Sequence, residues 1–264
     1  LLMASKATLD AQDNRGMTAL MWATVNADID CVQLLVNANA SLDIENKERL
    51  TALSLAAQYD NRECMRLLIA ARADLDHRDD EGLTALSWAS SREHAECAQQ
   101  LVDANAAVDI PDNVGNTALV HAVLKDSMTC AYMLTNANAN KNVTNGAGLT
   151  PLMMAVYIGD IVYASRILFS GIDIDARDRE GRTALMWAIR YRKSFVVPLI
   201  SQGADPNAMD RSDRSALAWA VLASDVDCIV QLVGRVANLD ARDEYNRTAL
   251  MLAAHHGRSD VMRV

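Results

Sequence analysis

Cysteine is the most reactive residue type in this 264-residue sequence, and its spacing is regular. A thiolate can attack a substrate, join a disulfide or bind zinc. The first four cysteines are 33 residues apart and the fifth falls in the same register: Cys31, Cys64, Cys97, Cys130 and Cys228. A constant spacing of this kind indicates repeats that stack, and equivalent helices of stacked repeats lie about 8–10 Å apart. A disulfide needs Cα atoms within about 7 Å, so these cysteines are too far apart to pair. Zinc needs thiolates that converge on one point. We therefore expect five small buried core residues and no metal site.

Tryptophan and histidine offer the next candidates. Each tryptophan lies four residues after a Thr or Ser, where other repeats carry Leu, Met or His: Trp22, Trp88, Trp187 and Trp219. Indole rings can stack on bases or sugars, but exchange with Leu and Met favours a core position. His255 and His256 are adjacent, so on a helix they point to different sides. No glycine-rich loop follows a strand, and no catalytic group converges with another. We predict no catalytic residues, no cofactor and no enzyme activity in this segment.

These residues belong to an internal repeat. A Thr-Ala-Leu triplet, or a close variant, recurs eight times at intervals of 33 residues, with one interval of 32. Its first residues are Thr18, Thr51, Thr84, Thr117, Thr150, Thr183, Ser215 and Thr248. We call this residue the cap, because a hydroxyl before an apolar run is typical of a helix N-terminus.

Each repeat predicts a helix, a turn, a second helix and a long polar loop. Pro151 supports the cap assignment, since proline is favoured at the first helical position. The second apolar run ends at a residue that tolerates the left-handed conformation: Asn39, Asn105, Asn138, Gly171 or Gly203. One such pair is too small to bury its apolar faces alone, so the pairs must stack.

The segments Asp178-Arg-Glu-Gly-Arg-Thr-Ala-Leu and Gly203-Ala-Asp-Pro-Asn-Ala resemble the ankyrin repeat, and the resemblance covers essentially the whole chain. It implies an all-α, helix-turn-helix solenoid with protruding β-hairpin-like loops. We expect one array, 1–264, that is a segment of a longer chain. Its predicted parts are a partial unit 1–12, full units 13–45, 46–78, 79–111, 112–144, 145–177, 178–209 and 210–242, and a partial unit 243–264.

Four positions depart from the pattern. Arg49 and Asp213 stand where the turn usually has glycine, and Val236 stands at a helix stop, so we expect local irregularity at each. The sixth unit is one residue short near residues 190–193 and carries Pro198 in its second helix. A proline in a helix interior removes a hydrogen bond and kinks the helix. The sequence leaves open whether this unit tolerates the irregularity or acts as a hinge.

Composition limits the partners. Hydrophobic residues make up 51% of the chain, and the net charge of −9 argues against a general nucleic-acid binder. Residues 1–144 carry 11 Lys and Arg against 20 Asp and Glu, whereas residues 145–264 carry 14 of each. The apolar stretch 149–169 contains Asp160 and Arg166 and stays in register, so it predicts a soluble helix pair and no membrane insertion. No secretory signal is apparent, which favours an intracellular, cytoplasmic location.

The resemblance implies that a partner binds the concave surface formed by the loop tips and the exposed face of each first helix. Carried onto this sequence, the residues expected to bind the partner are Tyr59, Arg92, Tyr157, Ile158, Arg179, Arg182, Arg190, Tyr191, Arg211, Arg214 and Leu222. Arginine and tyrosine dominate interface hot spots. We therefore expect the later repeats to hold an acidic or carboxylate-bearing peptide segment, unless neighbouring Asp residues pair with these arginines.

The expected function is that of a non-catalytic scaffold for protein–protein interaction, with a protein or peptide partner. Two alternatives remain at this point. The segment could be the targeting or substrate-recruiting arm of a longer enzyme or membrane protein. The arginine-rich later half could also bind an anionic ligand or nucleic acid, which steep weakening by salt would reveal.

Overall fold

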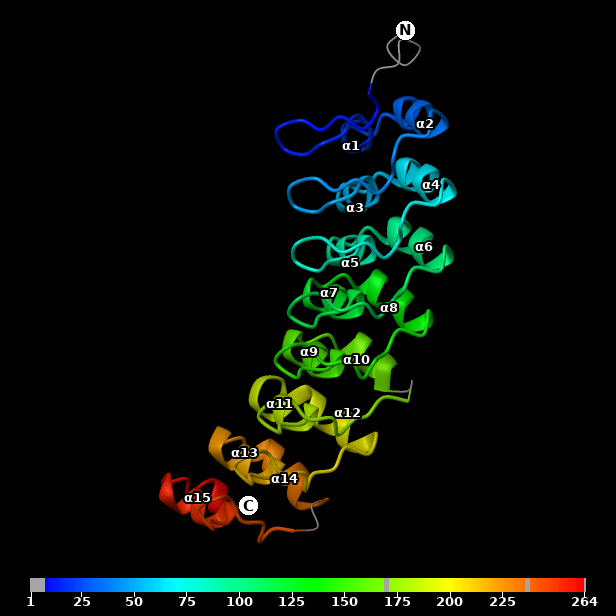
Figure 1. Ribbon diagram of the computed structural model, residues 1–264. Coiled ribbons are helices and arrows are strands. Elements are labelled where there is room, and N and C mark those ends of the chain that lie inside the picture. Colours follow the sequence, from blue (N-terminus) through cyan, green and yellow to red (C-terminus); the bar gives the residue numbers. More distant parts are fainter. Residues whose placement is uncertain (1–7, 169–170, 236–237, 264) are drawn as a thin grey trace. The chain divides into compact units, whose positions relative to one another are not determined.

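The structure is a computed structural model that describes residues 8–168, 171–235 and 238–263. Its contacts divide the chain into two compact units, residues 1–140 and 141–264. Each unit is a stack of helix pairs, so the expected all-α helix-turn-helix solenoid fold is confirmed within each of them (Figure 1).

The first unit contains four helix pairs whose first helices have seven residues and whose second helices have nine. The pairs are α1 (Ala19–Val25) with α2 (Ile29–Asn37), α3 (Ala52–Gln58) with α4 (Arg62–Ala70), α5 (Ala85–Ser91) with α6 (Ala95–Asp103), and α7 (Ala118–Leu124) with α8 (Met128–Asn136). Within this unit each first helix packs on the next first helix, and each second helix on the next second helix (Figure 1).

The second unit continues the pattern with less regular second helices. Its elements are α9 (Pro151–Ile158), α10 (Ile161–Leu168), α11 (Ala184–Tyr191), the 3-10 helix η2 (Lys193–Phe195), α12 (Val196–Ser201), α13 (Ala216–Ala223), α14 (Val226–Val233), α15 (Ala249–His255) and the 3-10 helix η3 (Val261–Arg263). The first helices α9, α11, α13 and α15 pack on one another in that order.

The helix boundaries follow from local chemistry. Each cap residue has an extended backbone, as at Thr18 with φ −89° and ψ 169°. At Thr51 the hydroxyl accepts a hydrogen bond from the backbone N–H of Ser54, at 3.3 Å. Pro151 is the first residue of α9, as expected. At six of the eight caps the hydroxyl therefore accepts from an N–H that has no partner within the helix, whereas Thr117 and Thr183 make no such bond.

The expected stops of the second helices are confirmed. All five residues named for this role have positive φ, between 61° and 96°: Asn39, Asn105, Asn138, Gly171 and Gly203. Arg72 takes the same conformation in the second repeat, with φ 68°. Val236, where strain was expected, lies outside the described residues.

The core is built on the leucine two residues after each cap. In the first seven repeats this leucine is at most 5% exposed, as at Leu53 and Leu185. Burying a leucine side chain stabilises a fold by about 1.5–3 kcal/mol, so the stack gains this contribution at each step. Leu250 of the eighth repeat is 60% exposed.

The apolar stretch that begins at Leu149 forms α9 and α10, separated by Gly159 in the left-handed conformation with φ 98°. The expected helix pair is therefore confirmed as far as Leu168; Phe169 lies outside the described residues. Within those described residues, every helix is too short or too polar to cross a bilayer.

The expectation of irregular turns at Arg49 and Asp213 is wrong. Both residues adopt the positive φ of the glycines at this position, 59° and 54°. Their turn hydrogen bonds are kept, from Arg49 N–H to the Asn46 carbonyl at 3.0 Å and from Asp213 N–H to the Asp210 carbonyl at 3.1 Å. The repeat therefore imposes its turn on residues that disfavour it, at a cost of about 1 kcal/mol or more each.

The sixth repeat absorbs its missing residue between its two helices. Arg192 has φ −150° where other repeats have a left-handed residue, and the 3-10 turn η2 follows. Phe195 then takes the buried place that Cys228 holds one repeat later. Pro198 is the third residue of α12, not an interior residue as expected. Because N–H groups of the first turn have no partner within a helix, proline costs little there.

Candidate protein-binding surface

Each loop tip is closed by an Asp or Asn side chain five residues before the cap. The Oδ1 atom of Asp178 accepts the backbone N–H groups of Glu180 at 2.9 Å and Arg182 at 2.8 Å. Asn145 makes the same two bonds, to Ala147 at 2.9 Å and Leu149 at 3.0 Å. The side chain thus replaces a strand pairing: in the described residues, Met209 with Ser215 is the lone β-bridge. The loops are hairpin-shaped and are held by these side-chain bonds together with a backbone bond, such as that from the Asp178 N–H to the Arg182 carbonyl at 3.0 Å.

The second oxygen of the aspartate explains the tryptophans. The indole N–H of Trp187 donates to Asp178 Oδ2 at 2.9 Å, and Trp219 donates to Asp210 Oδ2 at 3.0 Å. Equivalent bonds join Trp22 to Asp13, Trp88 to Asp79 and His121 to Asp112. The repeats with Asn at the loop tip carry Leu55 and Met154 instead, because an amide NH₂ cannot accept an indole proton.

The interpretation of tryptophan as plain core filler is therefore wrong. Trp219 is buried, but Trp22 is exposed and Trp88 and Trp187 are half-buried. Each indole spans the boundary between the helix and the loop tip, since its nitrogen must reach the aspartate. The sequence held the signal, because the tryptophans occur only in repeats with an aspartate at the loop tip.

Two of the arginines expected to bind a partner are engaged inside the repeat. Arg182 Nε lies 2.7 Å from Asp178 Oδ2, and Arg214 Nε lies 2.9 Å from Asp210 Oδ2. Both guanidinium groups lie 4.7 Å above an indole ring, that of Trp187 or Trp219. The carboxylates therefore neutralise these two arginines.

The pKa of Asp210 reflects this environment. Burial alone would raise it, but hydrogen bonds from the Arg214 backbone and guanidinium, from Ser212 and from Trp219 outweigh burial and hold the pKa below its ordinary value. The carboxylate is thus stabilised in its charged form.

The face of α9 and α11 carries an exposed aromatic cluster made of Tyr157, Trp187 and Tyr191. The ring of Tyr157 stands edge-on to Trp187 and to Tyr191, with centroids 5.9 Å and 5.4 Å apart. The rings of Trp187 and Tyr191 are stacked 5.1 Å apart. Tyr157 is 54% exposed and Tyr191 38% exposed. The structure thus brings together two expected site residues and adds Trp187, which sequence reasoning had placed in the core.

Arg190 extends this cluster toward α13. Its Nε lies 3.1 Å from the Tyr191 hydroxyl, and its guanidinium lies 5.4 Å from the Tyr191 ring centroid and 5.7 Å from that of Trp219. Arg190 is exposed, and within the described ranges no carboxylate lies close enough to form an ion pair with it. Its charge is therefore available to a ligand.

The other expected residues lie around this cluster or in the first unit. Arg179 and Arg211 are exposed at consecutive loop tips, and the described part of the chain gives neither an ion pair. The backbone N–H of Arg211 donates to the Glu180 carbonyl at 2.9 Å, which ties the two loops together. Ile158 and Leu222 are half-buried.

Tyr59 and Arg92 belong to the first unit, and both are exposed. The Arg92 guanidinium lies 5.2 Å above Trp88. This arrangement resembles that of Arg190, but sequence neighbours of Arg92 supply no second exposed aromatic ring.

Comparison with known families decides the identity. A family model described as ankyrin repeats (3 copies) matches residues 1–79, 67–145, 129–210 and 192–264. The chain belongs to the ankyrin repeat family. Ankyrin repeats are generally protein–protein interaction modules, and proteins of this family are typically non-enzymatic scaffolds. No curated protein matches this chain.

The ankyrin-repeat stack explains four of the five cysteines. Cys64, Cys97, Cys130 and Cys228 are buried, and all five thiols are free. Burial raises the pKa of Cys97, and a hydrogen bond to Asp60 adds to the shift, bringing it to about 12. Cys31 is exposed, which contradicts the expectation. Cys97 contacts Asp60 in the helix turn of the preceding repeat, whereas the described residues contain no helix pair before α1 and α2 that could cover Cys31.

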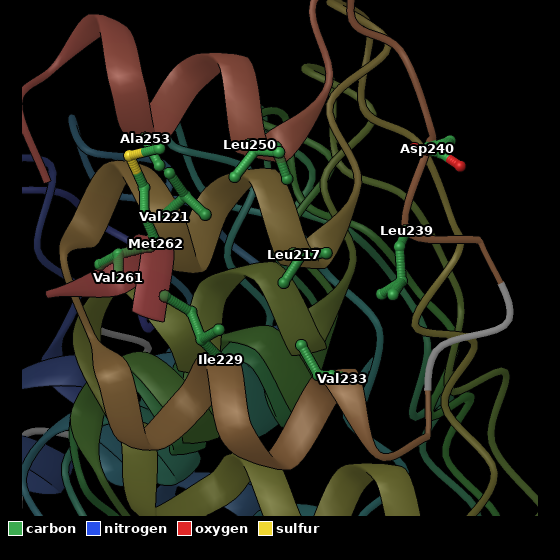
Figure 2. Close-up of a pocket in the computed structure, with 11 residues that line it drawn as sticks. Leu217, Val221, Ile229, Val233, Leu239, Asp240, Leu250, Ala253, Val261 and Met262 are labelled. Carbon is green, nitrogen blue, oxygen red and sulfur yellow. The ribbon is translucent and has the colours of Figure 1, made fainter. Parts of the chain in front are cut away.

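An apolar pocket of about 370 Å³ lies in the last two ankyrin repeats, between α13, α14, α15 and η3 (Figure 2). Leu217, Val221, Ile229 and Leu250 line it.

Proposed function

We propose that this chain is a non-catalytic scaffold that binds an acidic, extended segment of a partner protein on its second unit. The binding surface is formed by the aromatic cluster and three unpaired arginines: Tyr157, Trp187, Tyr191, Arg179, Arg190 and Arg211. We call it the second-unit face.

The observation that carries the proposal is the combination of exposed aromatic rings with arginines that form no ion pair within the described residues. Large aromatic side chains lose little conformational entropy on binding and are enriched in hot spots. The aromatic rings already pack on one another, so the protein loses little further freedom when a ligand binds. Unpaired guanidinium groups complement carboxylates of the partner.

The test uses a fluorescein-labelled peptide of ten glutamates and a peptide of ten glutamines as the neutral control. We expect the 264-residue chain to bind the glutamate peptide and not the glutamine peptide. Arg179→Glu combined with Arg211→Glu should weaken binding about a hundredfold, since like charges then oppose the peptide. Both residues are exposed and make no side-chain bonds to Asp178 or Asp210, so the loop tips should stay folded. Equal binding of both peptides would overturn the proposal.

Nucleic acid is the competing ligand for the same arginines. A 20-base-pair duplex added as competitor over a salt series separates the two. Displacement of the peptide by duplex, with affinity that falls steeply with salt, would indicate phosphate-driven binding and would replace the protein partner by a polyanion.

For localisation we propose the cytoplasm. Five cysteines without a disulfide among the described residues are typical of a reducing compartment. Fluorescence microscopy of the tagged full-length protein tests this, and accumulation in the secretory pathway would contradict it.

A further inference from the structure

We propose that Arg190 is the residue that selects a carboxylate on the partner, acting as a guanidinium clamped between Tyr191 and Trp219. The inference rests on the proposed function of the second-unit face and adds the residue that determines its specificity.

Three arginines of the second unit lie against tryptophan rings, and only one of them is unpaired. Arg182 and Arg214 each give their charge to a buried aspartate. Arg190 lies near the Trp219 ring as well, yet it has no carboxylate within the described part of the chain. The contrast is one of position: Arg182 and Arg214 precede their caps by one residue and reach the loop-tip aspartate, whereas Arg190 follows its cap by seven.

The Arg190 side chain is held in place before any ligand arrives. Its Nε donates to the Tyr191 hydroxyl at 3.1 Å, and two aromatic rings lie within 6 Å of its guanidinium carbon. The Nε bond fixes the plane of the guanidinium group, so its two terminal nitrogens are left to donate. A planar pair of donors matches the two oxygens of a carboxylate.

The two rings of this clamp are themselves anchored. Trp219 donates its indole N–H to the buried Asp210 at 3.0 Å. Tyr191 stacks on Trp187, which donates to the buried Asp178 at 2.9 Å. The loop-tip aspartates that close the repeats therefore also position the ligand-binding arginine, Asp210 through Trp219 and Asp178 through Trp187 and Tyr191.

Peptide binding with four variants tests the inference. Arg190→Gln should raise the Kd for the glutamate peptide about tenfold or more, the usual effect of losing a hydrogen bond to a charged group. Arg190→Lys should be nearly as weak, since an ammonium keeps the charge but lacks the planar fork. Tyr191→Phe keeps the ring and loses only the hydroxyl, so we expect a rise of about two- to fivefold.

Arg92→Gln is the matched control, because Arg92 is also an exposed arginine above a tryptophan, in the first unit. Its Kd should stay within about twofold of the wild type. Urea unfolding checks that all four variants are folded.

The outcomes separate the two proposals. Arg190→Gln with wild-type affinity, while Arg179→Glu with Arg211→Glu abolishes binding, would overturn the role of Arg190 and leave the second-unit face intact. Full binding by Arg190→Lys would show that charge alone suffices and would overturn the clamp. No binding of the glutamate peptide by the wild type would overturn the proposed function and this inference together.

Discussion

The two units stabilise the same loop-tip carboxylate in different ways. In the first unit, Asp79 receives the indole of Trp88 and no cation, and Asp112 receives neutral or titratable donors from Asn116 and His121. In the second unit, Asp178, Asp210 and Asp243 each receive an arginine. Each loop is closed by a side-chain oxygen of Asp or Asn, and among the described residues an arginine pairs with the loop-tip carboxylate in the second unit alone.

This difference contributes to the charge balance of the chain. Residues 1–144 hold the whole net charge of −9, and residues 145–264 are balanced. Three of the later arginines, Arg182, Arg214 and Arg247, are structural, since each compensates a buried aspartate. Among the described residues Arg190 does not pair with a loop-tip aspartate, and it lies beside the exposed ring of Tyr191.

Removing the carboxylate should cost more in the second unit than in the first. Asp178→Ala leaves Arg182 without its carboxylate and two backbone N–H groups unpaired, so we expect the free energy of unfolding to fall by about 3–5 kcal/mol. Asp79→Ala leaves two backbone N–H groups and the indole N–H of Trp88 without an acceptor, so we expect the free energy of unfolding to fall by about 1–3 kcal/mol. Urea unfolding measures both. Equal losses would show that arginine pairing adds nothing to the loop tip.

A sharper test converts one kind of repeat into the other. Asp178→Asn puts an NH₂ group against the N–H donors of Arg182 and Trp187. Because these donors then lack an acceptor, we expect the free energy of unfolding to fall by about 2–3 kcal/mol. Adding Arg182→Leu and Trp187→Met copies the natural set Asn145, Leu149 and Met154. We expect the triple variant to recover most of the loss, because the mismatched donors are gone.

The double variant Arg182→Leu with Trp187→Met is the control for this swap. It leaves Asp178 ionised with fewer partners and should be less stable than the triple variant. A triple variant no more stable than Asp178→Asn alone would mean that the pairing of residue types across repeats has another cause.

The sequence predicted those parts of the fold that depend on residues close in the chain. The caps and the left-handed stops are local features, and the repeat multiplied each signal eightfold. Arg49 and Asp213 misled the prediction because propensity opposes a positive φ there, while the stacked neighbours impose it. Pro198 did so because the 3-10 helix η2 takes the first turn of the second helix, so α12 begins only at Val196.

The binding surface was predicted less well, for a geometric reason. Arg182 and Arg214 precede their caps by one residue and Arg190 follows its cap by seven, but the sequence alone does not show that only the first position reaches the loop-tip aspartate. Trp187 was missed because exchange with Met154 suggested a core position. The residue nine positions after the loop tip is Trp187 where the loop tip is Asp178, and Met154 where it is Asn145. Comparing these two positions across repeats would have shown that Trp187 bonds the loop-tip aspartate.

The smallest expected effect is a pH dependence that distinguishes the units. The pKa of Asp210 is lower in the folded protein than its ordinary value of 3.8. Its contribution to stability is therefore complete above the unfolded pKa and is lost as the pH falls through the lower, folded pKa. Asp210→Asn should be less stable than the wild type at pH 7, and the two should converge as the pH falls through the lowered folded pKa of Asp210, because a protonated Asp210 resembles asparagine.

The matched variant in the first unit is Asp112→Asn. The pKa of Asp112 is also lowered: burial opposes the shift, and hydrogen bonds from Asn116, His121 and Val114 outweigh it. No guanidinium pairs with Asp112 in the described structure. We therefore expect a smaller difference in the free energy of unfolding between Asp112→Asn and the wild type at pH 7, and this difference should also disappear in acid. Urea unfolding from pH 7 to pH 2.5 measures both gaps. If the stability difference between Asp210→Asn and the wild type stayed unchanged in acid, the charge of Asp210 would not be its cause. The shape of the side chain would then be what holds the loops of the second unit together.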